Sequence, residues 1–234
     1  MRFGTFPAAV VLATAASLPP AARLGAQSAA TRPDTQSAPV SQPHSAPARV
    51  ARPLDRLLAE HILVLPVQYL TFGDSLGWSG KVRSARAYLG TVDDEIAFAL
   101  RERGLGTRWT LAPAIVESAS RNAGFAADPH AIEARELRPG AKLDEWQLQE
   151  PLASQLRSLI ALTDARYVLF PVEVRTSSTA KGARAMLHVV VVDARRSQVQ
   201  WAGDVYSSPR AAFSPAIAAE LASRLAELIA PPAP

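Results

Sequence analysis

The chain has 234 residues, 48% of them hydrophobic, which is enough apolar material for a packed core. It has no cysteine, which excludes disulfides, thiolate zinc sites and a lipid-modified cysteine. The formal net charge is +4 and no dense run of Lys and Arg accompanies it, so we expect no nucleic-acid partner.

The first 26 residues have the layout of a secretory signal peptide. Arg2 is followed by an apolar run over 6–18 and then by small residues that lead to Ala26, where we expect cleavage. This run is shorter than the roughly 20 residues that a spanning helix needs, and no later run is longer. The sequence therefore predicts an exported, periplasmic or outer-membrane-associated protein without a transmembrane helix in the mature chain. An amino-terminal membrane anchor is the alternative.

Residues 27–52 consist mainly of Ala, Pro, Ser, Gln and Thr and contain almost no large apolar side chain. This composition predicts a disordered linker, which either extends the reach of the domain or is a passive leader. Residues 53–231 have the size of one domain.

In the first half of the domain, the sequence pattern predicts strands and helices in alternation. The apolar run 62–67 is typical of a strand buried on both faces. Thr91 and Asp94 form a capping-box pattern, and the helix that they predict ends at Gly104. Residues 108–111 are expected to form a second strand.

Three prolines mark the starts of further helices, at Pro113, Pro151 and Pro215. Between the last two helices, the sequence predicts consecutive strands over 166–175, 183–193 and 199–207. The links between these strands are short and polar, which favours antiparallel hairpins over parallel crossovers. We therefore predict an α/β fold of the α+β type, in which helices pack on a mixed sheet with a carboxy-terminal antiparallel three-strand meander.

Side-chain alternation in these strands predicts which residues share a face. One face of the first strand carries Val168, Phe170, Val172 and Val174, and one face of the second carries Leu187, Val189 and Val191. The opposite face of the second strand is also apolar apart from His188, which indicates a central strand. Pro171 indicates a bulge or an edge position.

These stretches resemble the CsgG-like, TolB amino-terminal and LpoB-like domains of the bacterial envelope. The resemblance lies in Val64-Leu65-Pro66-Val67, in the segment 164–169, and in Val192-Asp193 through Trp201. It covers about 62–205 and implies a periplasmic α/β domain that binds protein partners, such as an assembly factor, a secretion accessory or a regulator of cell-wall synthases. The long amphipathic hairpins of a secretion pore are not evident in the sequence.

A second interpretation is enzymatic. The stretch Gly73-Asp74-Ser75-Leu76-Gly77 fits G-x-S-x-G and the first block of the GDSL esterases, with Ser75 as nucleophile. Those enzymes place Asp-x-x-His late in the chain, whereas the last histidine here, His188, lies inside an apolar strand. His130, beside Asp128, is then the base in this alternative. We expect no catalysis, and a secreted esterase using Ser75 and His130 remains the alternative.

Residues 68–90 are expected to form a long loop that binds the partner. Its predicted contacts are Tyr69, Phe72, Trp78, Lys81, Arg83, Arg86 and Tyr88, because exposed aromatic residues with arginine anchor many interfaces. The alternative is that the rings fold back onto the core. Residues 125–146 are a second segment of this kind.

The four histidines do not lie at ligand spacing, so neither a metal nor a cofactor is expected. The sequence thus favours a non-enzymatic envelope domain that binds a protein partner, with oligomers possible. The other hypotheses are the esterase and a carrier of a small ligand in a cleft between helices and sheet.

Overall fold

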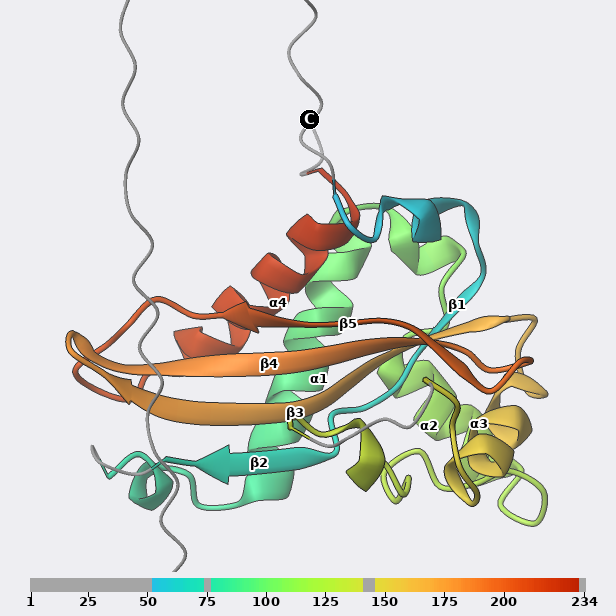
Figure 1. The fold of residues 1–234 in the computed structure, drawn as a ribbon, viewed down its shortest axis with the longest axis horizontal. Helices are drawn as coiled ribbons and strands as arrows, with labels where there is room; N and C mark the ends of the chain where they lie inside the picture. The colour runs from blue at the N-terminus through green and yellow to red at the C-terminus, as the bar shows by residue number, and fades with distance from the viewer. Residues whose placement is uncertain (1–51, 74–76, 141–145, 232–234) are drawn as a thin grey trace, which may run out of the picture. The chain divides into compact units, whose positions relative to one another are not determined.

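The computed structural model describes residues 52–73, 77–140 and 146–231, so the predicted signal peptide and nearly all of the predicted linker lie outside the described residues. In these ranges, helices pack on a five-stranded sheet (Figure 1). The strands are β1 (Ile62–Val64), β2 (Tyr69–Phe72), β3 (Tyr167–Thr179), β4 (Gly182–Asp193) and β5 (Gln198–Tyr206). The helices are α1 (Ala85–Glu102), α2 (Ala112–Arg121), α3 (Leu152–Ile160) and α4 (Ala216–Ile229). Short 3-10 turns cover Asp55–Ala59, Ser79–Lys81, Leu105–Thr107 and Arg135–Leu137.

The sheet is mixed, in the order β1-β3-β4-β5, with β2 also beside β3. β3, β4 and β5 are antiparallel neighbours, which confirms the predicted meander, and β4 has the predicted central place. β1 and β2 both run parallel to β3 and follow one another along its length, since Ile62 pairs with Tyr167 and Tyr69 pairs with Glu173. β3, the first strand of the meander, therefore pairs with both amino-terminal strands, β1 and β2.

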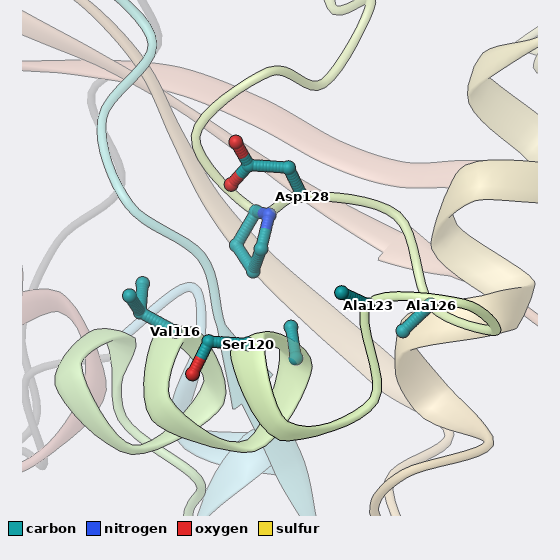
Figure 2. A pocket seen from close by; sticks show the side chains of 7 residues that line it. Val116, Ser120, Ala123, Ala126 and Asp128 are labelled. Atoms are coloured by element: carbon teal, nitrogen blue, oxygen red, sulfur yellow. The ribbon is translucent and has the colours of Figure 1, made fainter.

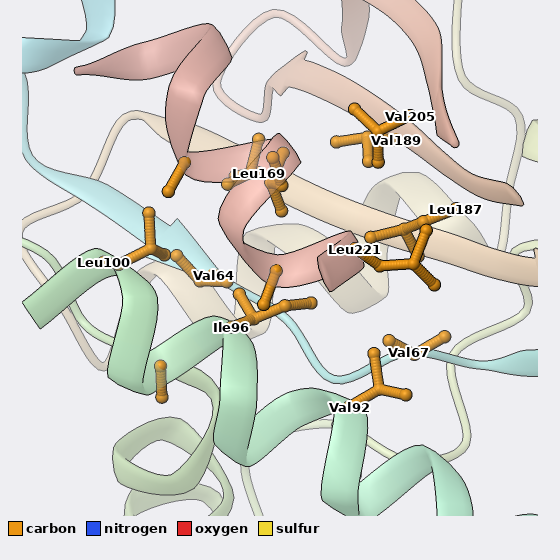
Figure 3. Close-up of a cluster of buried hydrophobic side chains, with 14 of the residues drawn as sticks. Val64, Val67, Val92, Ile96, Leu100, Leu169, Leu187, Val189, Val205 and Leu221 are labelled. Carbon is orange, nitrogen blue, oxygen red and sulfur yellow. The ribbon is translucent and has the colours of Figure 1, made fainter. Parts of the chain in front are cut away.

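One face of the sheet is covered by α1 and α4 (Figures 1 and 3). Apolar residues recur every fourth position on each helix, and these stripes meet the sheet residues Leu187 and Val189. Leu100, Leu221 and Leu187 are fully buried. Each such side chain contributes roughly 2 kcal/mol by leaving water. This cluster is the larger of the two cores.

The opposite face is covered by α2 and α3 over only part of its length. Ile115 from α2 and Leu156 from α3 pack with Phe170, Val190 and neighbouring valines near the β4–β5 turn. Beyond Val172 the side chains of β3 on this face become polar, beginning with Glu173. The apolar cover therefore ends in the middle of this face.

The predicted bulge is present, because the pairing of β3 with β4 shifts between Pro171 and Glu173. The extra residue reverses the alternation along β3. Val172 consequently packs in the α2/α3 core, whereas Val174 packs in the α1/α4 core. The prediction that Val174 shares a face with Phe170 is wrong for this reason.

The start of α1 also differs from the prediction. Ser84 caps the helix, with its Oγ accepting a hydrogen bond from the Ala87 N–H at 3.2 Å. Thr91 lies inside the helix and its hydroxyl donates to the Ala87 carbonyl, so Thr91 and Asp94 do not form a capping box. The helix stops before Gly104, which adopts a left-handed φ of 75° as its predicted role requires.

Two further predictions need correction. Residues 68–90 do not form one long loop, because they contain β2, a 3-10 turn and the first turns of α1. Residues 108–111 do not form a strand but only a bridge to β1, in which the Thr110 N–H donates to the Ile62 carbonyl at 2.9 Å. β2 and the bridge at Thr110 are both short, and each pairs with residues far away in the sequence. Local sequence patterns do not reveal such pairing.

Candidate partner-binding surface

The predicted aromatic residues of 68–90 largely pack inward. Trp78 is 2% exposed and its ring meets that of Phe213 edge-on, with centroids 5.8 Å apart. Tyr88 lies against the same ring at 5.7 Å, and Phe72 packs on the same core while half-buried. Phe213 immediately precedes α4, so these rings fix the start of α1 to the start of α4. Their role as partner contacts remains a prediction.

The predicted cations, in contrast, point into solvent. Lys81, Arg83 and Arg86 are exposed at the start of α1. The β3–β4 turn adds Lys181 and the first residues of β4 add Arg184. We call these five residues the basic end. No ion pair joins Lys81, Arg83, Lys181 or Arg184 to an acidic side chain among the described residues.

Backbone hydrogen bonds bring the parts of the basic end to the same end of the domain (Figure 1). The Gly73 N–H at the end of β2 donates to the Thr176 carbonyl at 3.0 Å. Ala183 and Arg210 exchange hydrogen bonds of 2.9 and 2.7 Å, which ties the β3–β4 turn to the segment that carries Phe213. The backbone segments that carry these cations are therefore held in place by hydrogen bonds.

Tyr69 lies on the other face, in a cluster around Glu173. The Glu173 side chain is fully buried and accepts hydrogen bonds from Arg138 Nε and Nη2, both at 2.9 Å. Arg175 adds longer contacts of 3.2 Å. Arg138 also lies over the Tyr69 ring, 4.8 Å from its centroid. The predicted contact Tyr69 thus helps to hold the segment after α2 on the sheet.

Burial alone would raise the pKa of Glu173. The hydrogen bonds from Arg138, Thr71 and Arg175 outweigh burial and lower this pKa to about 2. The carboxylate is therefore ionised throughout the neutral range. Its role is to anchor Arg138 and not to exchange protons.

Polar residues continue across the uncovered part of this face. Glu173 pairs in register with His188, and His188 with Asp204, which lies on β5. His188 Nδ1 lies 2.6 Å from Asp204 Oδ1. In the next row, Arg184 lies over the Tyr206 ring at 4.2 Å from its centroid, and the Tyr206 hydroxyl donates to Asp204 at 3.3 Å. We call Arg175, Arg184, His188, Asp204 and Tyr206 the open face.

The described residues do not bring together the nucleophile and the base that the esterase hypothesis requires. Ser75 lies outside the described residues. The Asp128 carboxylate accepts the backbone N–H of His130 at 2.9 Å. His130 lines a hollow of about 180 Å³ beside Asp93, at the junction of α1 and α2.

Asp93 is the unusual carboxyl of this hollow. It is buried, and its Oδ1 accepts the Val67 N–H at 2.8 Å, in the link between β1 and β2. Burial raises the pKa of Asp93 to about 7, although the Val67 hydrogen bond and the charge of Arg86 oppose the increase. The position of Asp93 inside α1, facing a backbone N–H, indicates support of the β1–β2 link.

A shallow hollow of about 340 Å³ lies between α2 and residues 126–129, at the start of the second predicted segment (Figure 2). Val116, Ser120 and small alanines line one side, and Asp128 lines the other (Figure 2). In the same segment, Phe125 is 67% exposed and Trp146 is 50% exposed. The space between the helices and the sheet, where a carrier cleft was predicted, holds the buried side chains of the two cores. The carrier hypothesis remains a prediction.

Neither a metal centre nor a membrane-spanning helix is found in the described ranges. Within these ranges, no group of three or more His, Asp or Glu side chains is placed to hold a metal ion. No helix in them combines the length and apolar character that crossing a membrane requires.

Sequence reasoning missed Lys181, Arg184, Arg138 and Glu173. Lys181 lies in a predicted polar link and Arg184 is the second residue of the predicted strand 183–193, so the sequence places both at the end of a hairpin. The pairing of Arg138 with Glu173 had no local pattern because the residues lie 35 positions apart.

The sequence matches no protein-family model and no curated protein. Among solved structures, it is similar to LpoB-like lipoprotein domains. The carboxy-terminal domain of LpoB from Salmonella enterica is 14% identical, with 66% of this chain and 87% of that chain covered and a TM-score of 0.35. The lipoprotein GNA1162 from Neisseria meningitidis is 15% identical over 65% of this chain and 84% of that chain, with a TM-score of 0.32.

PelC from Paraburkholderia phytofirmans, solved as a dodecamer, is 13% identical over 74% of this chain and 89% of that chain, with a TM-score of 0.36. Similarity at these values assigns neither a function nor a partner to this chain.

Proposed function

We propose that this protein is an exported, non-enzymatic domain of the bacterial cell envelope that binds a protein partner. The observation that carries the proposal is the basic end. Four exposed or half-exposed cations, Lys81, Arg83, Lys181 and Arg184, lack an acidic partner among the described side chains. The aromatic contacts of Trp78 beneath them hold the backbone in place.

Unpaired cations on a fixed base favour recognition of another macromolecule. A surface ion pair within the chain would cancel their charge, whereas here the charge remains available to a partner. Such a surface increases the rate of association and makes it dependent on salt, because the Debye length is about 8 Å at physiological ionic strength. The signal-peptide pattern and the sequence resemblance to envelope domains support the envelope as the compartment.

Site-specific photocrosslinking in native envelopes tests the proposal. A photoreactive residue at Arg83 should capture a specific protein, identified by mass spectrometry, and the capture should decrease in Lys81→Glu combined with Lys181→Glu. Arg101 is the matched control, since it is an exposed arginine on α1 outside the basic end. Identical products from positions 83 and 101, or no product, would contradict the proposal.

Activity-based labelling tests the enzymatic alternative directly. We expect no labelling of the purified protein by a fluorophosphonate probe, either in the natural chain or in Ser75→Ala. Labelling of the natural chain that disappears in Ser75→Ala would establish a serine hydrolase and overturn the non-enzymatic assignment.

A further inference from the structure

The outer edge of β5 is only partly paired. Residues 146–148 cover its first part, where the Val199 N–H donates to the Trp146 carbonyl at 2.8 Å. Arg56 then reaches the Gln200 carbonyl at 3.5 Å. No described segment pairs with this edge from Ala202 to Tyr206.

The pairing with β4 fixes which backbone groups face outward. The Ser207 N–H donates to the Ala185 carbonyl at 2.9 Å, so Ser207 faces β4. In an antiparallel ladder this orientation alternates, so the residues at 203 and 205 also face β4. The N–H and C=O groups of Ala202, Asp204 and Tyr206 therefore point away from the sheet.

Edge strands commonly carry a charged side chain that discourages further pairing. Asp204 is the charged residue here, but its carboxylate is engaged within the chain. It contacts His188 Nδ1 at 2.6 Å and accepts the Tyr206 hydroxyl at 3.3 Å. The His188–Asp204 pair is not hydrogen-bonded through its backbone, the arrangement in which side chains approach most closely. The edge thus keeps its outward backbone groups, while the Asp204 carboxylate contacts His188 of β4.

The charge next to the edge is positive. Arg184 lies over the Tyr206 ring, so its guanidinium is held beside the edge strand, and Lys181 is exposed at the adjoining turn. Neither forms an ion pair with a described acidic residue. A strand placed next to β5 would present alternate side chains to the open face, within reach of these cations. Acidic side chains complement them.

We infer that the outer edge of β5, over Ala202–Tyr206, accepts an extended acidic segment of the partner as an additional strand. The inference rests on the proposed function and names the chemistry of the partner. The outward backbone groups supply main-chain hydrogen bonds, and Arg184 with Lys181 selects acidic side chains.

A labelled ten-residue peptide of alternating Glu and Val is the probe, and a Lys–Val peptide of the same length is its charge-reversed counterpart. Fluorescence anisotropy should show binding of the acidic peptide only. Ala202→Pro removes one outward N–H, at a position where an edge strand accepts proline, and should weaken binding at least tenfold. Ala202→Ser keeps that N–H and should bind as the natural chain does. Arg184→Met should weaken binding severalfold and reduce its dependence on salt.

Hydrogen exchange of the natural chain provides a readout that does not depend on the variants. The acidic peptide should slow exchange at Ala202, Asp204 and Tyr206, while Gly203 and Val205 are already protected by β4. Absence of this protection, equal binding of the Lys–Val peptide, or unchanged binding by a folded Ala202→Pro would overturn the inference. If crosslinking from Arg83 persists in any of these cases, the proposed function stands without it.

Discussion

The two faces of the sheet are covered in different ways. α1 and α4 cover one face with a continuous apolar cluster. On the other face, α2 and α3 stop at the bulge after Pro171, and charged rows follow. Leu187 and His188 are neighbours in β4, yet one is in the core and the other contacts Asp204. The first face therefore supplies most of the stability, and the second leaves polar side chains outside its apolar core.

The largest difference between the faces should appear in truncations within β4. We expect Leu187→Ala to lower the free energy of unfolding by about 3 kcal/mol, because it leaves a cavity in the larger core. Met186→Ala, the neighbour whose side chain belongs to neither apolar cluster, should cost less, about 2 kcal/mol. Denaturant unfolding measures both. Equal losses would contradict the assignment of stability to the α1/α4 face.

The next largest effect concerns the buried charge on the second face. Arg138→Met should lower the free energy of unfolding by about 2 kcal/mol at pH 7, a value below the usual cost of an unpaired buried charge because Arg175 remains and Arg138 is partly exposed. Glu173 has a lowered pKa, so its stabilising contribution is present above about pH 4.5 and is lost as the pH falls toward 2.

The penalty for Arg138→Met should therefore decrease in acid. Glu173→Gln in the same background should restore part of the stability at pH 7. A penalty that is constant from pH 7 to pH 3 would show that Arg138 acts through packing alone.

The third effect lies at the junction of the first face with β1 and β2. Asp93 has a raised pKa, so the stability that it contributes is complete below about pH 3.8 and is lost as the pH rises through 7. Asp93→Asn removes this titration and should be the more stable form at pH 8, because it has no carboxylate to ionise in the buried site.

At pH 4 the natural chain and Asp93→Asn should differ little. Thermal unfolding across pH 4 to 8 measures the two slopes, with Glu102→Gln, an exposed carboxyl at the end of α1, as the control. Parallel slopes for the natural chain and Asp93→Asn would contradict burial of the ionised carboxyl.

The sequence predicted the meander well because its information is local. Alternating valines define β4, short polar links define the turns, and Pro171 indicated the bulge. The same reasoning failed for Val174, since a bulge reverses the alternation after it. The predicted start of α1 was also too late. The first turns, which Ser84 caps, contain the exposed residues 85–87 and Gly90, so they show no apolar periodicity.

The candidate surface was predicted only in part. Lys81, Arg83 and Arg86 are exposed as the sequence suggested, whereas the ring of Trp78 is buried under Phe213. Sequence separation explains the rest. β2 pairs with β3 about one hundred residues later, and Phe213 lies 135 positions after Trp78, so neither contact leaves a local pattern.

The parallel pairing of β1 and β2 with β3 has a consequence for biosynthesis. Both strands emerge from the ribosome long before residues 167–176, the part of β3 with which they pair, have been made. The nascent amino-terminal half cannot complete its sheet, whereas the carboxy-terminal meander needs only its own neighbours. A chain of this design reaches its final structure only after its last third has been made.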